Sequence, residues 1–278
     1  EPSAGAVAGG ELFRVVLQDG RSVSSSEMEH TPVEVIRLTS DAKSPRAEDR
    51  FAGHRIAATF TSASPAFTVA WSAELRDGSN GVTMRAVLTA GADGLPLTEF
   101  IVLDACIPGA KVCGEVDGSP VVADRWFLAC EHPLAINRVE GDRVTGGRSR
   151  PGLAAAQTVA LDASVGITPP GQLRRAFLYH LERRRAHPYR PFLHYNSWYH
   201  LNIGRPDHRM TEAESLETIA FIGRELVRKR GVTLDAFVWD DGWDDFNSLW
   251  EFHHGFPNGF SATRKAGEAF GASQGVWI

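Results

Sequence analysis

The chain has 278 residues, of which 43% are hydrophobic, and a formal net charge of −5 at pH 7. This length and this hydrophobic content suffice for one large domain, or for two of moderate size, with a buried core. The charge is too small to predict nucleic acid or an anionic membrane as a partner, and no apolar run approaches the roughly 20 residues of a transmembrane helix.

The first residues read EPSAGAVAGGELF and contain neither an initiator Met nor the basic and apolar segments of a signal peptide. This start is typical of a trimmed or mature end. We therefore expect a secreted or periplasmic protein.

The three cysteines are Cys106, Cys113 and Cys130, and they form neither a CxxC pair nor a metal-binding spacing with histidine. Cys106 and Cys113 flank IPGAKV and are compatible with a small disulfide loop. Three buried or half-buried free thiols are the preferred interpretation, because an odd number of cysteines is a poor disulfide framework.

The first 170 residues predict short strands separated by turns rich in Gly, Pro and Asp. A loop of hairpin type, RDGSNG at 76–81, follows one of them. In the next run, VTMRAVLTA, alternation places Val82, Met84, Ala86 and Leu88 on one face. The predicted strands are 55–61, 67–75, 82–90, 99–105, 119–129 and 158–164. Repeated short strands without a long helix indicate a β-sandwich over 1–170.

The pattern changes after the Pro-Gly segment at 168–171. The run QLRRAFLYHLERRR at 172–185 has apolar or aromatic residues on one helical stripe. These residues are Leu173, Ala176, Phe177, His180 and Leu181. The arginines fall mostly on the remaining surface, where a solvated face is favoured over an anion-binding site. The sequence thus predicts a helical linker over 171–190.

From residue 191 the pattern alternates between strand and helix. Strands are predicted at 191–198, 234–240 and 275–278, and a short helix at 261–270. Thr211 and Glu214 form a capping box that opens the first helix. Its expected apolar face consists of Leu216, Ile219, Ala220, Leu226 and Val227, and Gly231 ends it. Such alternation indicates a parallel sheet, either a barrel or an open sheet.

Polar and aromatic residues gather where two of these strands end. Asn196 and Trp198 end the first strand, and Asp240, Asp241 and Trp243 end the second. In parallel sheets, ligands bind beyond the carboxyl ends of the strands. Carboxylates accept hydrogen bonds from vicinal hydroxyls, and an indole covers the apolar face of a sugar ring. The pattern therefore favours sugar binding over a pair of aspartates that merely orders a loop.

Other roles of the acidic run are less favoured. An EF-hand loop needs carboxylates at alternate positions and then a Gly, which the four aspartates of 240–245 do not provide, so no metal site is predicted. Asp244 and Asp245 are expected to cap a helix. The nearby aromatic residues Trp250, Phe252, Phe256 and Phe260 are expected to pack. His253 and His254 are expected in an exposed loop, and His194 in the core.

Three motifs carry a resemblance to a known group of enzymes. NSWY, VWDDGW and GVWI, on successive predicted strands, resemble the α-galactosidase clan of glycoside hydrolases. The chain is most similar to family 36, which includes α-N-acetylgalactosaminidases, and VVADRWFLACEHPLA at 121–135 resembles a late sandwich strand of bacterial members. The resemblance implies a multidomain fold: a β-supersandwich at 1–170, a helical linker at 171–190, and the first three units of an incomplete (β/α)8 TIM barrel at 191–278.

The resemblance also implies a retaining mechanism with one aspartate as nucleophile and another as acid and base. The family carries these residues near its fourth and sixth barrel strands, so none is assigned in this chain. By the same resemblance, Asp240 and Asp241 hold the 4- and 6-hydroxyls of a terminal galactose-type sugar. Trp198 and Trp243 form the pocket wall, and Asn196 lies at the same mouth.

The leading hypothesis is the amino-terminal part of an exo-α-glycosidase that removes α-linked galactose or N-acetylgalactosamine from oligosaccharides or glycoconjugates. On this hypothesis the natural protein is longer, the 278 residues are inactive alone, and no cofactor, membrane or nucleic acid is involved. An oligomer is compatible with it. The alternative is a non-catalytic carbohydrate-binding protein. An unrelated enzyme with an open α/β sheet is less favoured, because GxGxxG, Walker and GxSxG motifs are missing.

Overall fold

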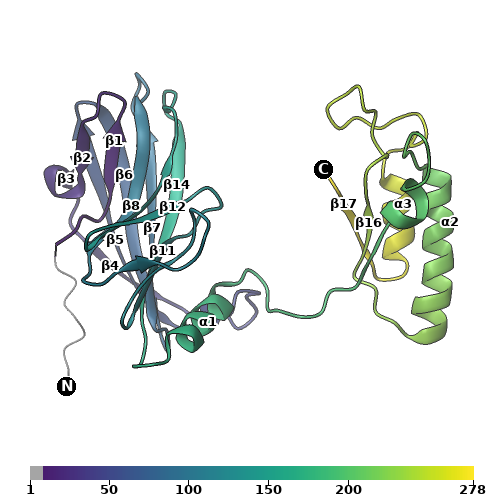
Figure 1. The fold of residues 1–278 in the computed structure, drawn as a ribbon, viewed down its shortest axis with the longest axis horizontal. Coiled ribbons are helices and arrows are strands. Elements are labelled where there is room, and N and C mark those ends of the chain that lie inside the picture. The colour runs from purple at the N-terminus through teal and green to yellow at the C-terminus, as the bar shows by residue number, and fades with distance from the viewer. Residues whose placement is uncertain (1–8) are drawn as a thin grey trace. The chain divides into compact units, whose positions relative to one another are not determined.

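The computed structural model describes residues 9–278. The chain divides into two compact units, with the boundary between Tyr189 and Arg190. Figure 1 labels the elements of each unit. None of the described helices is long and apolar enough to cross a lipid bilayer.

The first unit contains two antiparallel sheets. The smaller sheet has the order β12 (Ile136–Glu140), β13 (Arg143–Ser149), β8 (Leu97–Cys106), β1 (Arg14–Leu17) and β2 (Ser22–Ser24). The larger sheet has the order β3 (Glu29–His30), β5 (Gly53–Ala63), β6 (Ala66–Arg76), β7 (Gly81–Ala90), β14 (Thr158–Ile167), β11 (Trp126–Cys130), β10 (Val121–Ala123) and β9 (Lys111–Val112), and β4 (Glu34–Leu38) also pairs with β5.

The two sheets enclose one hydrophobic core, to which both contribute alternate residues (Figure 1). Val15 of β1 and Leu88 of β7 are fully buried in it, and Ala86 lies on the same face of β7 as Leu88. The alternation predicted for β7 is therefore confirmed, and so is the β-sandwich. The hairpin predicted at 76–81 joins β6 to β7.

The predicted single strand at 119–129 is wrong, because the structure has two strands there. Ala123 of β10 pairs with Trp126 of β11, which leaves a two-residue turn at Asp124 and Arg125. Asp124 has φ +45°, in the left-handed region that Asp tolerates better than most residues. Alternation continues through such a tight turn, so the apolar pattern did not reveal it.

Helix α1 (Leu173–Arg184) belongs to the first unit and packs on the larger sheet. The rings of Phe177 and His180 lie 5.3 and 5.1 Å from the ring of Phe127. The predicted helix is confirmed, but its faces differ from the prediction. Leu181 is 37% exposed, whereas Arg183 is only 4% exposed. The Arg183 guanidinium lies 4.1 Å from the centre of the Phe51 ring and donates a hydrogen bond to the Asp77 carbonyl.

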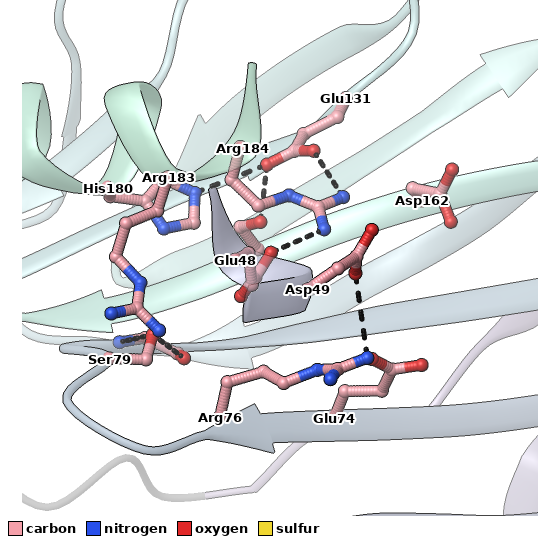
Figure 2. Close-up of polar contacts among 12 residues, drawn as sticks. Glu48, Asp49, Glu74, Arg76, Ser79, Glu131, Asp162, His180, Arg183 and Arg184 are labelled. Atoms are coloured by element: carbon pink, nitrogen blue, oxygen red, sulfur yellow. Dashed lines mark hydrogen bonds and ion pairs between the residues drawn. The ribbon is translucent and has the colours of Figure 1, made fainter. Parts of the chain in front are cut away.

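An ion network fastens the same helix to the sandwich (Figure 2). The Arg184 guanidinium lies 2.9 Å from a Glu48 carboxylate oxygen and 3.4 Å from one of Glu131. His180 Nε2 lies 3.4 Å from the other Glu131 oxygen, which also accepts a hydrogen bond from Ser164. Burial by itself raises the pKa of Glu131, but these hydrogen bonds and the Arg184 charge outweigh burial and lower the pKa to about 2. Glu131 is thus a carboxylate at neutral pH.

The second unit is a parallel sheet with helices. Strands β15 (His194–Asn196), β16 (Ala236–Trp239) and β17 (Ser273–Val276) lie in sequence order. Helices α2 (Glu212–Ile222) and α3 (Ser261–Glu268) lie on the same side of this sheet (Figure 1). Helical turns at 198–202 and 223–228 follow β15 and α2. The predicted capping box is confirmed, since the Glu214 amide donates to Thr211 Oγ1 and the Thr211 amide donates to Glu214 Oε2.

Alternation along β16 gives the sheet two distinct faces. Phe237 and Trp239 enter the core of the second unit, on the side of the helices. Ala236 and Val238, one position out of phase, face the other way. The face predicted for α2 is only partly right, because Ser215 and Thr218 are buried with Ile219 while Ala220 and Leu226 are exposed.

Candidate functional site

The residues that end β15 and β16 contact each other directly. The strands pair in register, with Asn196 opposite Val238. Asn196 Nδ2 donates a hydrogen bond of 2.8 Å to Asp240 Oδ2, which fixes the Asp240 carboxylate on the sheet face opposite the helices. The structure thus brings together two of the residues that the sequence singled out.

The backbone holds this pair in place. The fully buried Ser197 accepts a 2.8 Å hydrogen bond at Oγ from the Asp240 amide. The Asp241 amide donates to Asp240 Oδ1 at 2.9 Å, so both Asp240 oxygens are engaged. Within residues 9–278, no group hydrogen bonds to the Asp241 carboxylate. Asp240 is therefore oriented by the protein, whereas the described residues leave the acceptors of the Asp241 carboxylate unused.

The turn after Asp241 requires glycine. Gly242 has φ +91°, and a Cβ atom at this position would collide with the His208 carbonyl oxygen. Asn202, which is fully buried, donates from Nδ2 to the carbonyl oxygens of His208 and Asp241. The Met210 amide donates to the Gly242 carbonyl. The DDG motif is thus packed against the segment that follows β15.

The two predicted wall residues have different environments. Trp198 is half-buried, its ring stacks on the His208 imidazole with centroids 5.4 Å apart, and its amide donates to Asn196 Oδ1. Trp243 is only 4% exposed and packs against Phe252 and Phe260 in the core of the second unit. Burial leaves its indole little surface for a ligand.

Two predictions for the acidic run are wrong. No helix begins at Asp244 or Asp245 in the described chain. Asp244 is buried and pairs with Phe252 in an isolated bridge, and Asp245 Oδ1 accepts hydrogen bonds from the amide and the side chain of Asn247. Both aspartates order a loop, as Asp often does without a helix.

Two histidine predictions are also wrong. His194 is exposed and lies on the same strand face as Asn196. His253 is buried, since its Nε2 donates to the Met210 carbonyl at 2.9 Å and its Nδ1 accepts from the Gly255 amide. His254 is exposed, as predicted. Sequence position alone gave no information about these hydrogen-bond partners.

The cysteines are free thiols, as the preferred interpretation predicted, although Cys113 is exposed. Burial raises the pKa of Cys130 to about 12, so its thiol stays protonated. Among residues 9–278 there is no group of three or more His, Cys, Asp or Glu side chains that could hold a metal ion.

Sequence reasoning missed two supporting residues of the site. Asn202 and His208 lie between β15 and α2, in a segment without a motif or periodicity. The sequence places Ser197 at the end of the first strand without a predicted role, and in the structure its hydroxyl accepts a hydrogen bond from the Asp240 amide. The arrangement supplies a fixed and a free carboxylate, an amide and a half-buried indole at one sheet edge. Carboxylate and amide groups in such an arrangement can form hydrogen bonds with neighbouring hydroxyls.

Neither a known family model nor a curated protein matches the sequence. Among solved structures, the chain is similar to the GH36 α-galactosidase AgaA from Geobacillus stearothermophilus, at 16% identity and a TM-score of 0.51 over 96% of this chain and 45% of AgaA. A doubly substituted AgaA in complex with stachyose matches at 14% identity with the same TM-score and coverage. The α-N-acetylgalactosaminidase NagBb from Bifidobacterium bifidum, in its GalNAc complex, matches at 13% identity and a TM-score of 0.36 over 98% of this chain and 54% of NagBb.

The likeness to AgaA concerns the fold. This chain spans about 45% of the length of AgaA. Within that length it has a GH36-like fold, which confirms the resemblance inferred from the NSW and DDGW motifs.

Proposed function

We propose that this chain is the amino-terminal part of a retaining exo-α-glycosidase that removes terminal α-linked galactose or N-acetylgalactosamine. The observation that carries the proposal is the Asn196–Asp240–Asp241 arrangement at the carboxyl ends of adjacent parallel strands, in a chain with a GH36-like fold. Within the proposal, β15, β16 and β17 are the first three strands of a (β/α)8 barrel.

The order of the strands supports a barrel over an open sheet. β15, β16 and β17 are neighbours in sequence order, and α2 and α3 lie on one side (Figure 1). An open doubly wound sheet places helices on both faces, whereas a barrel places them all outside. The face with Asn196 and Asp240 would then be the barrel interior, where the substrate pocket of such enzymes opens.

The chemistry of the pair supports a sugar-holding role. Asp240, fixed by Asn196 and the Asp241 amide, would accept a hydroxyl hydrogen only at its remaining lone pairs. Asp241, with its carboxylate free, would accept from the neighbouring hydroxyl. A sugar epimer whose 4-hydroxyl cannot reach this carboxylate leaves the carboxylate without a hydrogen bond. This cost is the proposed basis for selecting an axial 4-hydroxyl.

The catalytic nucleophile and the residue that serves as acid and base are proposed to come from later barrel strands, as the family resemblance implies. Asp240 and Asp241 lie at the second strand and are assigned sugar binding only. The AgaA structure in complex with stachyose motivates α-galactosyl oligosaccharides as the substrate class to test first.

The test is hydrolysis of para-nitrophenyl α-galactoside and α-N-acetylgalactosaminide by the product of the complete gene. We expect the Asp241→Ala variant to lower kcat/KM by about 100-fold or more, which corresponds to roughly 3 kcal/mol for a lost charged hydrogen bond. Glu217→Gln, which changes an exposed carboxylate of α2, is the matched control and should retain the rate.

The outcomes separate the hypotheses. Hydrolysis by the wild type and its loss in Asp241→Ala support the glycosidase. Galactose binding without hydrolysis supports the carbohydrate-binding alternative. An Asp241→Ala variant with unchanged kinetics would refute the sugar-holding role of the pair, whichever sugar is the substrate.

A further inference from the structure

The segment that follows the DDG motif forms a closed loop between Trp243 and His253. The His253 amide donates to the Trp243 carbonyl, and the Asp245 amide donates to the Glu251 carbonyl at 2.7 Å. Inside the loop, the Ser248 amide and hydroxyl both donate to the Asp245 carbonyl, and the Glu251 amide donates to Ser248 Oγ. The backbone of this loop is therefore well ordered by its own hydrogen bonds.

This ordered loop presents large apolar side chains to solvent. Trp250 is 46% exposed and Leu249 is 84% exposed. Trp250 also has φ +63°, a conformation that costs a bulky residue roughly 1 kcal/mol or more. An unfavourable backbone angle at an exposed apolar residue points to a function for that residue. Adjacent exposed apolar side chains are typical of interaction sites.

The Trp250 ring is connected to the candidate sugar site. It stacks on the ring of Trp243, with centroids 6.2 Å apart and planes inclined by 22°. Trp243 follows Asp241 by two residues, which span at most about 7 Å. The exposed indole is thus linked through the Trp243 ring to the turn that carries Asp241.

We propose that Trp250 is the platform for the sugar next to the terminal residue, on the leaving-group side, so that the protein prefers α-linked oligosaccharides to the free monosaccharide. This inference rests on the proposed function. Trp243 supports one face of the indole and holds it in place. The apolar C–H face of a pyranose covers the exposed surface, in the manner of other aromatic stacking contacts.

The test compares two ligands in the product of the complete gene. The inhibition constant of galactose measures binding of the terminal sugar at the Asp241 site. The KM of stachyose measures binding of the terminal sugar together with the neighbouring sugar at Trp250. Trp250→Ala should raise the KM for stachyose about fivefold to tenfold, because one stacking contact is lost, and leave the galactose constant within about twofold. Trp250→Phe should lie between the wild type and Trp250→Ala.

The control is Phe221→Ala, which removes an exposed aromatic ring of α2 and should change neither constant. Equal losses for galactose and stachyose in Trp250→Ala would overturn the inference, because Trp250 would then act through the structure of the site. Unchanged stachyose kinetics would also overturn it and would favour a protein surface as the occupant of the loop. If the wild type neither binds nor hydrolyses an α-galactoside, the proposed function itself fails.

Discussion

Asp240 and Asp241 are adjacent in sequence but have different surroundings. Asp240 is fixed through both carboxylate oxygens, whereas the Asp241 carboxylate accepts no hydrogen bond from residues 9–278. The difference arises because β16 ends between an amide side chain on β15 and a sharp turn at Gly242. Two aspartates at the end of β16 thus differ in role: the protein orients the carboxylate of Asp240 and leaves the acceptors of Asp241 unused.

Gly242 is the residue on which this turn depends. Gly242→Ala should lower the free energy of unfolding by more than about 2 kcal/mol, because the left-handed angle and the collision with the His208 carbonyl both oppose a side chain. Gly231→Ala is the matched control, since Gly231 has φ +65° but no atom within 4 Å of the added Cβ, and should cost about 1 kcal/mol. Urea unfolding monitored by tryptophan fluorescence measures both. Equal losses would mean that the collision is relieved by movement of the 208–210 segment.

At the scale of elements, each helix depends on contacts at its ends or on one side. α2 begins at a reciprocal capping box, and Arg205 also pairs with Glu214 at 2.7 Å. α1 has no side-chain cap, and its attachment comes from Phe177, His180 and the two arginines that face the sandwich. Local sequence therefore determines where α2 starts, whereas the sheet surface decides how α1 is held.

The capping box of α2 gives a prediction at this scale. Thr211→Ala should lower the free energy of unfolding by about 1 kcal/mol, because the Glu214 amide loses its acceptor. Thr211→Ser keeps the hydroxyl and should lose little. Thermal unfolding followed by circular dichroism at 222 nm compares the two, and a loss in Thr211→Ser as large as in Thr211→Ala would show that the methyl group, not the cap, matters.

At the scale of the whole molecule, two units of different architecture make up the chain, and an ion network joins α1 to the sandwich of the first (Figure 2). Glu131 is 30% exposed at its side chain and is the centre of that network. Glu48 and Arg184 extend it to the segment between β4 and β5. Residues far apart in sequence thus share one electrostatic cluster.

The ion network predicts that the free energy of unfolding depends on pH in the acidic range. The pKa of Glu131 is lowered to about 2 from 4.5. The stabilisation that the ionised Glu131 carboxylate gives to the folded state is therefore complete above pH 4.5 and is lost as the pH falls through 2. Glu131→Gln should lower the free energy of unfolding by about 1–2 kcal/mol at pH 7, and the difference from the wild type should shrink as pH falls below 4.

Glu225→Gln is the matched control for this experiment. Hydrogen bonds from Lys229 and Arg224 lower the pKa of Glu225 to about 2 as well, but both of these partners are more than half exposed. Solvent screens such pairs, so the change should have little effect on urea unfolding between pH 2.5 and 7. A constant difference between wild type and Glu131→Gln across this range would contradict the assigned role of Glu131.

The sequence by itself determined the β-sandwich, the strand and helix alternation after residue 190, the capping box at Thr211 and the strand-end location of Asn196, Asp240 and Asp241. These features depend on residue periodicity, turn chemistry and local hydrogen bonds, which lie within a few residues of each other. Only the tertiary structure decided that Trp243 is buried and that Arg183 of α1 packs on the Phe51 ring. The same holds for the hydrogen bond of His253 to Met210, and for the support that Asn202 and His208 give to the DDG turn. Those contacts join residues whose separation in sequence leaves no local pattern, because burial and partners are set by how elements pack.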